Sequence, residues 1–267
     1  MEGALRGCLS GETLQLLEEC ESTLTSSKNH GCHHARGAEY ETFLQARRFD
    51  DKKKMTTSPL AMQKHTRFGV FARNAQRVAV NIEEVGVFYK EFCKKVPITI
   101  RHIATYKTTM LCQLAAAALV YTHLVSSYWS KVSSPINKGR YEEIESLFEQ
   151  TVGDLVKAAS PSLAITADAN KFKADTEMEE GFPEVVHSLA RDEETSKALD
   201  ECVITHLTAA LATFNRFKTE NLGNLEGLVM FTNQVCIIIK FSYRNLVFRM
   251  PSVPSEQGRT RSYRSTM

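Results

Sequence analysis

The sequence has few glycines and prolines, and it shows little of the alternation between apolar and polar residues that marks strands. Only 13 glycines and 7 prolines occur among 267 residues, of which 43% are hydrophobic. So few turn-forming residues argue against a protein built from many short strands. A chain of this length and apolar content can bury one large core or two small ones. We therefore predict an all-α protein with long helices.

Motifs of the common enzyme classes are also missing. The chain contains no GxGxxG or P-loop motif, no GxSxG nucleophile motif and no HExxH zinc motif. Paired carboxylates such as Glu83-Glu84 and Glu142-Glu143 fall on helix faces that we expect to be exposed, where solvation is their ordinary role. We therefore expect no enzymatic activity, no catalytic residue and no cofactor.

One short polar stretch gathers residue types that bind zinc. In the letters NHGCHH, Cys32 lies among His30, His33 and His34. A structural zinc site needs about four ligands at defined separations, and no second CxxC or HxxxH pair follows nearby. We predict a solvated loop here and no metal site.

The chain also lacks the features of secreted or lipid-anchored proteins. Its 7 cysteines are odd in number and widely spread, and several fall in apolar helical patterns, where a reduced cysteine behaves as a small hydrophobe. The first ten residues have no apolar signal-peptide core, and neither a myristoylation glycine nor a prenylation cysteine is present. We expect a reduced, cytoplasmic protein.

Charge is distributed unevenly along the chain, although the net charge is only +2. Residues 47–140 contain 17 Lys and Arg against 5 Asp and Glu, whereas residues 168–201 contain 4 against 11. Such segregation indicates that one basic face meets an acidic partner, a membrane or a nucleic acid.

Apolar residues at steps of three and four predict long amphipathic helices. From Leu60 to about Val132 the apolar series is nearly continuous, and we expect a kink at Pro97. A helix is expected from Tyr141 to Lys157, with a break at Ser160-Pro161, and a last long helix from Glu184 to about Phe248. Apolar helix faces this long predict an elongated antiparallel helical bundle, which a second copy of the chain completes.

Three regions follow from these patterns. Residues 1–59 form an N-terminal region with short helices expected over 10–24 and 38–49. Residues 60–250 form the long-helix domain. Residues 251–267, with two prolines, several serines and three arginines, are expected to be a disordered basic tail.

Two apolar segments raise the question of a membrane span. The run LVMFTNQVCIIIKF is too short and too polar in its middle to cross a bilayer. Its spacing predicts a packing stripe instead, and we assign a dimer seam to Leu225, Leu228, Val235, Ile239 and Leu246. The run LCQLAAAALVYTHLV, residues 111–125, contains Gln113 and His123 and is predicted to be a buried core segment.

The last helix resembles the final helix of BAR domains, in the letters FNRFKTENLGNLEGLVMFTNQVCIIIKFSYRNL. The first helix resembles the first BAR helix, in the letters NIEEVGVFYKEFCKKVPITIRHIATYKTTMLCQL. The resemblance covers roughly residues 62–248. It is compatible with one branch of the family, the ciliary BAR proteins that partner Chibby. It implies three long kinked helices per chain, an antiparallel homodimer, and binding to acidic membranes whose curvature the dimer senses or shapes.

The chain departs from the BAR pattern at the expected tip. The segment from Pro161 to Glu180 is poorly helical, and the tip around Gly181-Phe182-Pro183 is acidic. We therefore place the contact with an anionic phospholipid membrane along the first helix. The predicted lipid-binding residues are Lys64, Arg67, Arg73, Arg77, Lys90, Lys94, Lys95, Arg101 and Lys107, and Phe68 and Phe71 are candidates for membrane insertion.

Other interpretations remain open for these residues. The basic residues can form a merely solvated helix face, and both phenylalanines can pack on the bundle. The chain can also be a helical scaffold or adaptor whose basic face binds an acidic protein, with a protein partner on residues 1–59 or the C-terminal tail. We expect no nucleic acid, because most aromatic residues fall in the apolar stripe and not among exposed basic residues.

Overall fold

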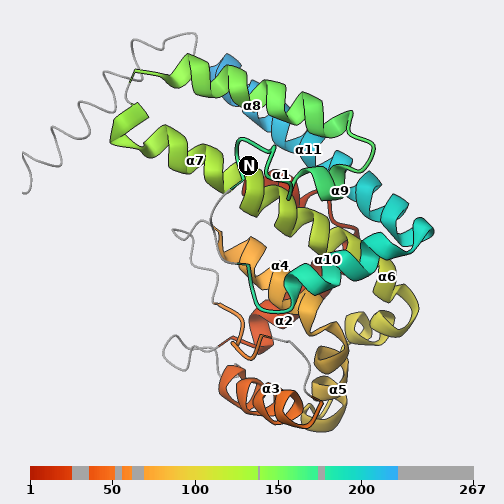
Figure 1. Ribbon diagram of the computed structural model, residues 1–267. Coiled ribbons are helices and arrows are strands. Elements are labelled where there is room, and N and C mark those ends of the chain that lie inside the picture. The colour runs from red at the N-terminus through yellow and green to blue at the C-terminus, as the bar shows by residue number, and fades with distance from the viewer. Residues whose placement is uncertain (26–35, 52–55, 62–68, 138, 174–177, 222–267) are drawn as a thin grey trace, which may run out of the picture. The chain divides into compact units, whose positions relative to one another are not determined.

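The computed structural model describes residues 1–25, 36–51, 56–61, 69–137, 139–173 and 178–221 of the chain (Figure 1). Every regular element in these ranges is a helix, and an isolated bridge joins Thr25 to Leu60. The prediction of an all-α protein is confirmed. The chain divides into a compact unit, Met1–Asn215, and a second unit, Arg216–Met267, of which only the first residues belong to the described ranges.

The N-terminal region forms the two short helices expected from its sequence, α2 (Gly11–Thr23) and α3 (Gly37–Asp51). It also forms α1 (Glu2–Arg6), which was not predicted. Helix α2 begins at Gly11 because the hydroxyl of Ser10 accepts a hydrogen bond from the Thr13 amide, at 3.3 Å, and so caps a free N–H of the first turn. The compact unit Met1–Asn215 contains this region and all the described helices that follow it, except for the last residues of the final helix.

The predicted helix from Leu60 to Val132 is divided into shorter helices. These are α4 (Val70–Val80), α5 (Ile82–Phe92), α6 (Ile98–Val120), the π-helix η1 (Tyr121–Val125) and α7 (Ser126–Ser133). Asn81 separates α4 from α5 with φ −110° and ψ 24°, and its side-chain amide donates to the carbonyl of Thr56 at 2.9 Å. Residues 93–97 separate α5 from α6, so the chain at Pro97 leaves the helix instead of merely kinking it.

The C-terminal half begins with a turn and ends in the longest helix. Its elements are the 3₁₀-helix η2 (Pro135–Asn137), α8 (Tyr141–Val156), α9 (Pro161–Ala164), α10 (Phe182–Arg191) and α11 (Glu193–Asn221). Gly181, with φ +86°, begins α10 in a conformation that favours glycine. Asp192, between α10 and α11, has an extended backbone, and its carboxylate accepts a hydrogen bond from the Thr195 amide at 3.0 Å. This bond caps the start of α11. The predicted continuous helix from Glu184 is therefore divided at Asp192.

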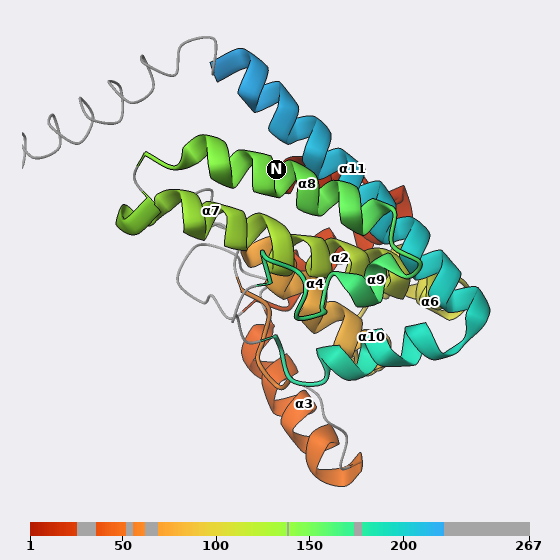
Figure 2. The same cartoon turned by 45° about the horizontal axis from the view of Figure 1, so that its top comes forward.

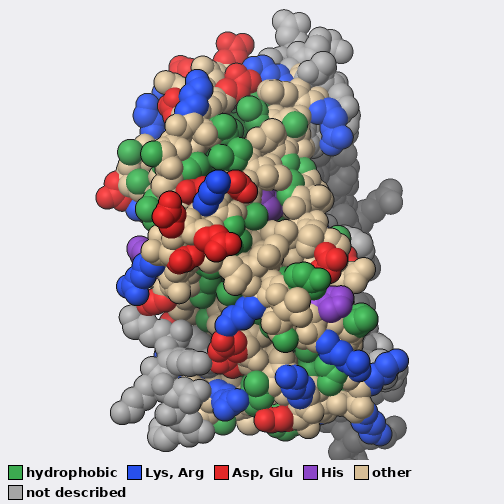
Figure 3. Space-filling view, turned by 90° about the vertical axis from the view of Figure 1, so that its right-hand side faces the viewer, with side chains coloured by type: hydrophobic (Ala, Val, Ile, Leu, Met, Phe, Trp, Pro, Cys, Tyr) green, Lys and Arg blue, Asp and Glu red, His purple; other side chains and the backbone are tan. Residues whose placement is uncertain are grey.

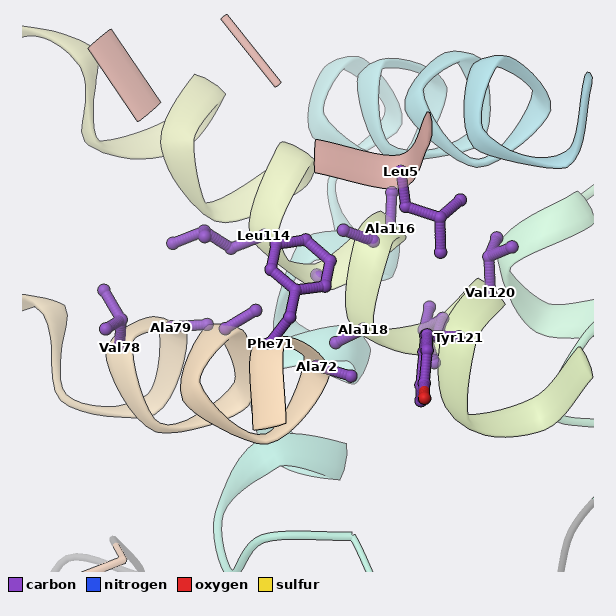
Figure 4. Packing of buried hydrophobic residues seen from close by; sticks show 14 of the residues in the cluster. Leu5, Phe71, Ala72, Val78, Ala79, Leu114, Ala116, Ala118, Val120 and Tyr121 are labelled. Carbon is purple, nitrogen blue, oxygen red and sulfur yellow. The ribbon is translucent and has the colours of Figure 1, made fainter. Parts of the chain in front are cut away.

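The described helices share one hydrophobic core. Phe71 of α4 lies between α4 and α6 with Leu5 of α1 and Leu114 close by, and all three side chains are fully buried (Figure 4). Helices α7, α8 and α11 run side by side (Figures 1 and 2), where the rings of Tyr128 and Phe148 lie 4.7 Å apart. The finer prediction of three long helices in a BAR-like bundle is not confirmed by these shorter elements.

The alanine-rich part of α6 is buried, as predicted for residues 111–125. Every side chain from Leu114 to Val125 is buried, and the side chain of Gln113 accepts the Ser10 amide at 2.9 Å. By length and composition alone, the 36 residues Ile98–Ser133 could cross a membrane, but 78% of their most apolar window is buried inside the structure. A core helix passes the same test, so this segment is weak evidence for a span.

Candidate functional site

The predicted row of basic residues separates into distinct groups in the structure. Lys64 and Arg67 lie outside the described residues, as does Phe68. Arg77 pairs with Glu179 at 2.9 Å, and Arg73 lies 3.7 Å from the same carboxylate. Lys107 pairs with Glu83. The charge of Arg77 is therefore paired inside the fold, whereas the side chains of Arg73, 62% exposed, and Lys107, 41% exposed, are paired but remain at the surface.

Four further basic side chains of the predicted row are exposed. Lys90, Lys94, Lys95 and Arg101 form no ion pair with any other described side chain. They lie at the junction of α5 and α6, residues 90–106, which we call the elbow. Apart from the exposed carboxylate of Glu91, no Asp or Glu occurs in the elbow or further along the chain before Glu142. The elbow is therefore a surface with strong local positive charge.

The backbone of the elbow follows directly from its sequence. Val96 precedes a proline and so disfavours helical geometry, and Pro97 has φ −57° and ψ 153° immediately before α6. Cys93 is extended at the end of α5. The guanidinium of Arg36, at the start of α3, donates to the carbonyl of Phe92 and lies 3.4 Å from the sulfur of Cys93. Arg36 thus ties the C-terminal end of α5 to a neighbouring helix.

Large apolar side chains are exposed on the same elbow. Ile98 is 66% exposed, Tyr106 48% and Phe92 45%. Phe92 is partly supported by the rings of Phe43 and Phe88, whose centroids lie 5.7 Å and 5.1 Å away. Figure 3 shows Lys and Arg side chains interspersed with hydrophobic ones over the lower part of the face that carries α5 and the start of α6.

The row that faces outward on α6 continues from Ile98 to Tyr106. These two residues and His102 follow one another at steps of four, and the rings of His102 and Tyr106 meet edge to face at 5.8 Å. Of residues 98–109, only Thr99, Ile100 and Ile103 are buried. The first half of α6 is thus a surface helix, whereas its second half is a core helix.

The prediction that Phe71 inserts into a membrane does not fit its position. Its side chain is fully buried in the core (Figure 4), with the guanidinium of Arg6 over its ring at 5.1 Å. The packing interpretation, also drawn from the sequence, matches this position. Phe92 and Tyr106 were not predicted to be exposed, because they continue the apolar series that predicts a buried stripe, and Ile98, which lies outside that series, was not assigned a role.

All members of the predicted dimer seam lie outside the described residues, namely Leu225, Leu228, Val235, Ile239 and Leu246.

Near the predicted tip, Lys171 is exposed, and the ammonium of Lys173 lies 2.5 Å from the carboxylate of Asp168, which lowers the pKa of that carboxyl. The tip therefore offers less free positive charge than the elbow.

A second candidate site is the π-helix around His123. Neither ring nitrogen of this buried histidine has a hydrogen-bond partner, and burial, with a smaller effect of Lys173, lowers its pKa. π-helical turns often mark functional sites. Among the described residues, however, no group of three His, Cys, Asp or Glu side chains is placed to hold a metal ion, and His30, Cys32, His33 and His34 lie outside them. We regard His123 as a neutral core residue.

Comparison of the chain with protein-family models, curated proteins and solved structures finds no match. The elbow is therefore interpreted from its own chemistry.

Proposed function

We propose that the protein is a non-enzymatic, peripheral membrane-binding protein that attaches to anionic phospholipid surfaces through the elbow. The observation that carries the proposal is the mixture of side chains there. Four exposed cations without an ion pair to a described side chain alternate with three exposed apolar residues over 17 positions, 90–106. This combination suits the headgroup region of a bilayer, where charged and apolar groups are both satisfied.

The charges alone account for weak binding. Each Lys or Arg near an anionic leaflet contributes about 1 kcal/mol. Four such residues give about 4 kcal/mol, which corresponds to a dissociation constant of about 1 mM. Useful attachment then needs a further contribution, either from apolar contact or from a second copy of the site.

A homodimer supplies a second copy. We propose that the chain dimerises through the apolar residues assigned to the seam, from Leu225 to Leu246, so that two elbows act on one membrane with a raised effective concentration. A cytoplasmic dimer of this kind can sense or shape curvature, as the BAR resemblance implies. The membrane proposal itself requires only the elbow and not a BAR-like arrangement of three long helices.

Sedimentation with phosphatidylserine vesicles tests the proposal. The triple variant Lys90→Glu, Lys94→Glu, Lys95→Glu is expected to lose most binding, and binding of the wild type is expected to weaken as salt rises, because exposed charges are screened within about 10 Å at 0.1 M salt. The double variant Lys171→Glu, Lys173→Glu is the control for charge reversal elsewhere and is expected to bind nearly as well as the wild type.

Circular dichroism checks that each variant is folded, since exposed substitutions usually change stability little. Equal binding by the triple variant and the wild type would remove the elbow as the membrane site. If the wild type binds no anionic vesicle, the cationic surface is better explained by an acidic protein partner, which is the scaffold or adaptor function.

A further inference from the structure

We infer that the elbow inserts Ile98, Phe92 and Tyr106 into the boundary between lipid headgroups and acyl chains, so that it selects anionic membranes with loosely packed headgroups. This inference rests on the proposed membrane function and adds a preference to it. A merely electrostatic site would respond to the surface charge of the membrane, whereas an inserting site also responds to the space between headgroups.

Exposed apolar side chains are concentrated in the elbow. Among the described residues, the large hydrophobic side chains that are markedly exposed number six, and three of them lie within the elbow. The other three are Trp129, Ile136 and Leu163, which are at least 23 positions further along the chain. An elbow that only attracted lipid phosphates would gain nothing from Ile98 at 66% exposure, since this side chain interacts unfavourably with water.

The cations of the elbow flank its exposed apolar residues. Lys94 and Lys95 lie in the non-helical linker between Phe92 and Ile98, and Arg101 is one turn beyond Ile98 on α6. Long cationic side chains can extend to phosphates while their neighbours enter the apolar layer. No acidic residue on α6 opposes this approach, because none occurs in Ile98–Val120.

The fold limits how deeply the elbow can insert. Helix α6 is exposed only in its first half, and residues from Met110 onward are held in the core. The fold therefore presents only residues 98–109 of α6 to a membrane, with a kink at Tyr106 (φ −115°, ψ 17°), which is far short of the roughly 20 residues of a span. Insertion must be shallow, and shallow insertion is easiest where curvature or small headgroups separate the lipid headgroups.

Site-specific fluorescence tests insertion separately from binding. The chain has one tryptophan, Trp129, so a Trp129→Phe background provides a silent protein into which Ile98→Trp places one reporter. Ile136→Trp in the same background is the matched control, because Ile136 is 89% exposed and lies outside the elbow. The probes are phosphatidylserine vesicles with brominated acyl chains, and sedimentation of the same samples measures the bound fraction.

We expect the bound Ile98→Trp protein to show a blue-shifted emission that brominated lipid quenches, and the Ile136→Trp protein to show neither. In sedimentation, Ile98→Gln should bind vesicles about tenfold more weakly than the wild type, because burial of an isoleucine side chain in an apolar phase raises affinity by about ten- to a hundredfold. Ile136→Gln should bind like the wild type. The wild type should also prefer small, highly curved vesicles over large ones of the same composition.

The outcomes separate the two proposals. Wild-type binding to anionic vesicles, with unquenched emission from the Ile98→Trp protein and an unaffected Ile98→Gln variant, would overturn insertion and leave the electrostatic membrane function intact. Absence of wild-type binding to every anionic vesicle would overturn the membrane function itself, and the insertion inference with it.

Discussion

The carboxylate of Glu179 lies 2.9 Å from the guanidinium of Arg77, and both side chains are about five-sixths or more buried, with 15% and 13% exposure. The same carboxylate accepts the hydroxyl of Thr56 at 2.9 Å, and the Glu179 amide donates to the buried side chain of Gln76 at 2.9 Å. Glu179 thus joins α4, the 56–61 segment and the residues before α10. It also explains why Arg77 belongs to the fold and not to the basic surface.

Replacing Glu179 should therefore destabilise the protein more than replacing its neighbour Glu180. Glu179→Gln removes the charge that a largely buried arginine faces, and we expect a loss of about 2 kcal/mol in the free energy of unfolding, measured by urea denaturation. Glu180 pairs with Arg48 at 2.7 Å, but both side chains are nearly half exposed, so Glu180→Gln should cost less than about 1 kcal/mol. Equal losses for the two variants would contradict the structural role of Glu179.

Apolar spacing predicted the positions of most helices but not all of their ends. The short helices α2 and α3 and the helix α8 follow the sequence patterns closely. The break at Asp192 was missed, although Asp192 is followed by Glu193 and Glu194, and an acceptor before an acidic first turn is a helix-start signal. Between Leu189 and Leu199 the only apolar residues are alanines, so apolar spacing does not locate the break there.

The sequence predicted the basic residues of the candidate site but not which of them form ion pairs. A row of basic residues is visible in the sequence, but pairing of Arg77 with Glu179 joins residues 102 positions apart, and tertiary packing decides it. The apolar part of the elbow was missed for a related reason. Phe92 and Tyr106 have the spacing of core residues and Ile98 falls beside that series, and only the fold shows that nothing among the described residues covers these three side chains fully.

Two buried histidines should make the protein less stable in acid. Burial lowers the pKa of His123 and of His206, whose Nδ1 lies 2.7 Å from the carbonyl of Cys202. Below the unfolded value of about 6.5, the unfolded chain binds protons that the folded protein does not. Stability is therefore fully present above that pH and is lost as pH falls from it toward the lowered folded values, by at most about 1.4 kcal/mol per pH unit for each histidine.

Urea denaturation at several pH values between about 8 and about 5 measures this effect. The variant His123→Phe removes one buried ring that titrates and should reduce the loss of stability on acidification. His187→Gln is the control, because His187 is exposed. An unchanged pH dependence in His123→Phe would show that His123 does not remain neutral in the folded protein.

The apolar series at the end of the chain should control the oligomeric state. We expect the wild type to sediment as a dimer of about twice the 30.0 kDa chain mass. Ile239→Asp should produce a monomer, because an unpaired charge in an apolar seam costs several kcal/mol. Lys240→Asp adds the same side chain one position away from the assigned seam, and it should remain dimeric. A dimeric and equally stable Ile239→Asp protein would show that the seam is placed wrongly.

Arg36 should control how firmly the elbow is held. Its guanidinium donates to the carbonyl of Phe92, pairs with Glu39 at 2.6 Å and lies over the ring of Phe88 at 5.6 Å. A hydrogen bond from a charged donor contributes about 1.5–3 kcal/mol, so its loss in Arg36→Gln should speed local opening of the end of α5 by about tenfold or more. Amide hydrogen exchange, read by mass spectrometry on peptides that cover residues 88–100, measures the rate.

A matched variant on α3 itself separates the Arg36 contact from the contribution of that helix as a whole. Arg48 lies on α3 but pairs with Glu180, so Arg48→Gln should leave the peptides over residues 88–100 unchanged. If both variants accelerate exchange there equally, the elbow depends on α3 as a whole and not on the Arg36 contact. If neither does, the end of α5 is held by its own hydrogen bonds, such as that from the Cys93 amide to the Tyr89 carbonyl at 3.2 Å.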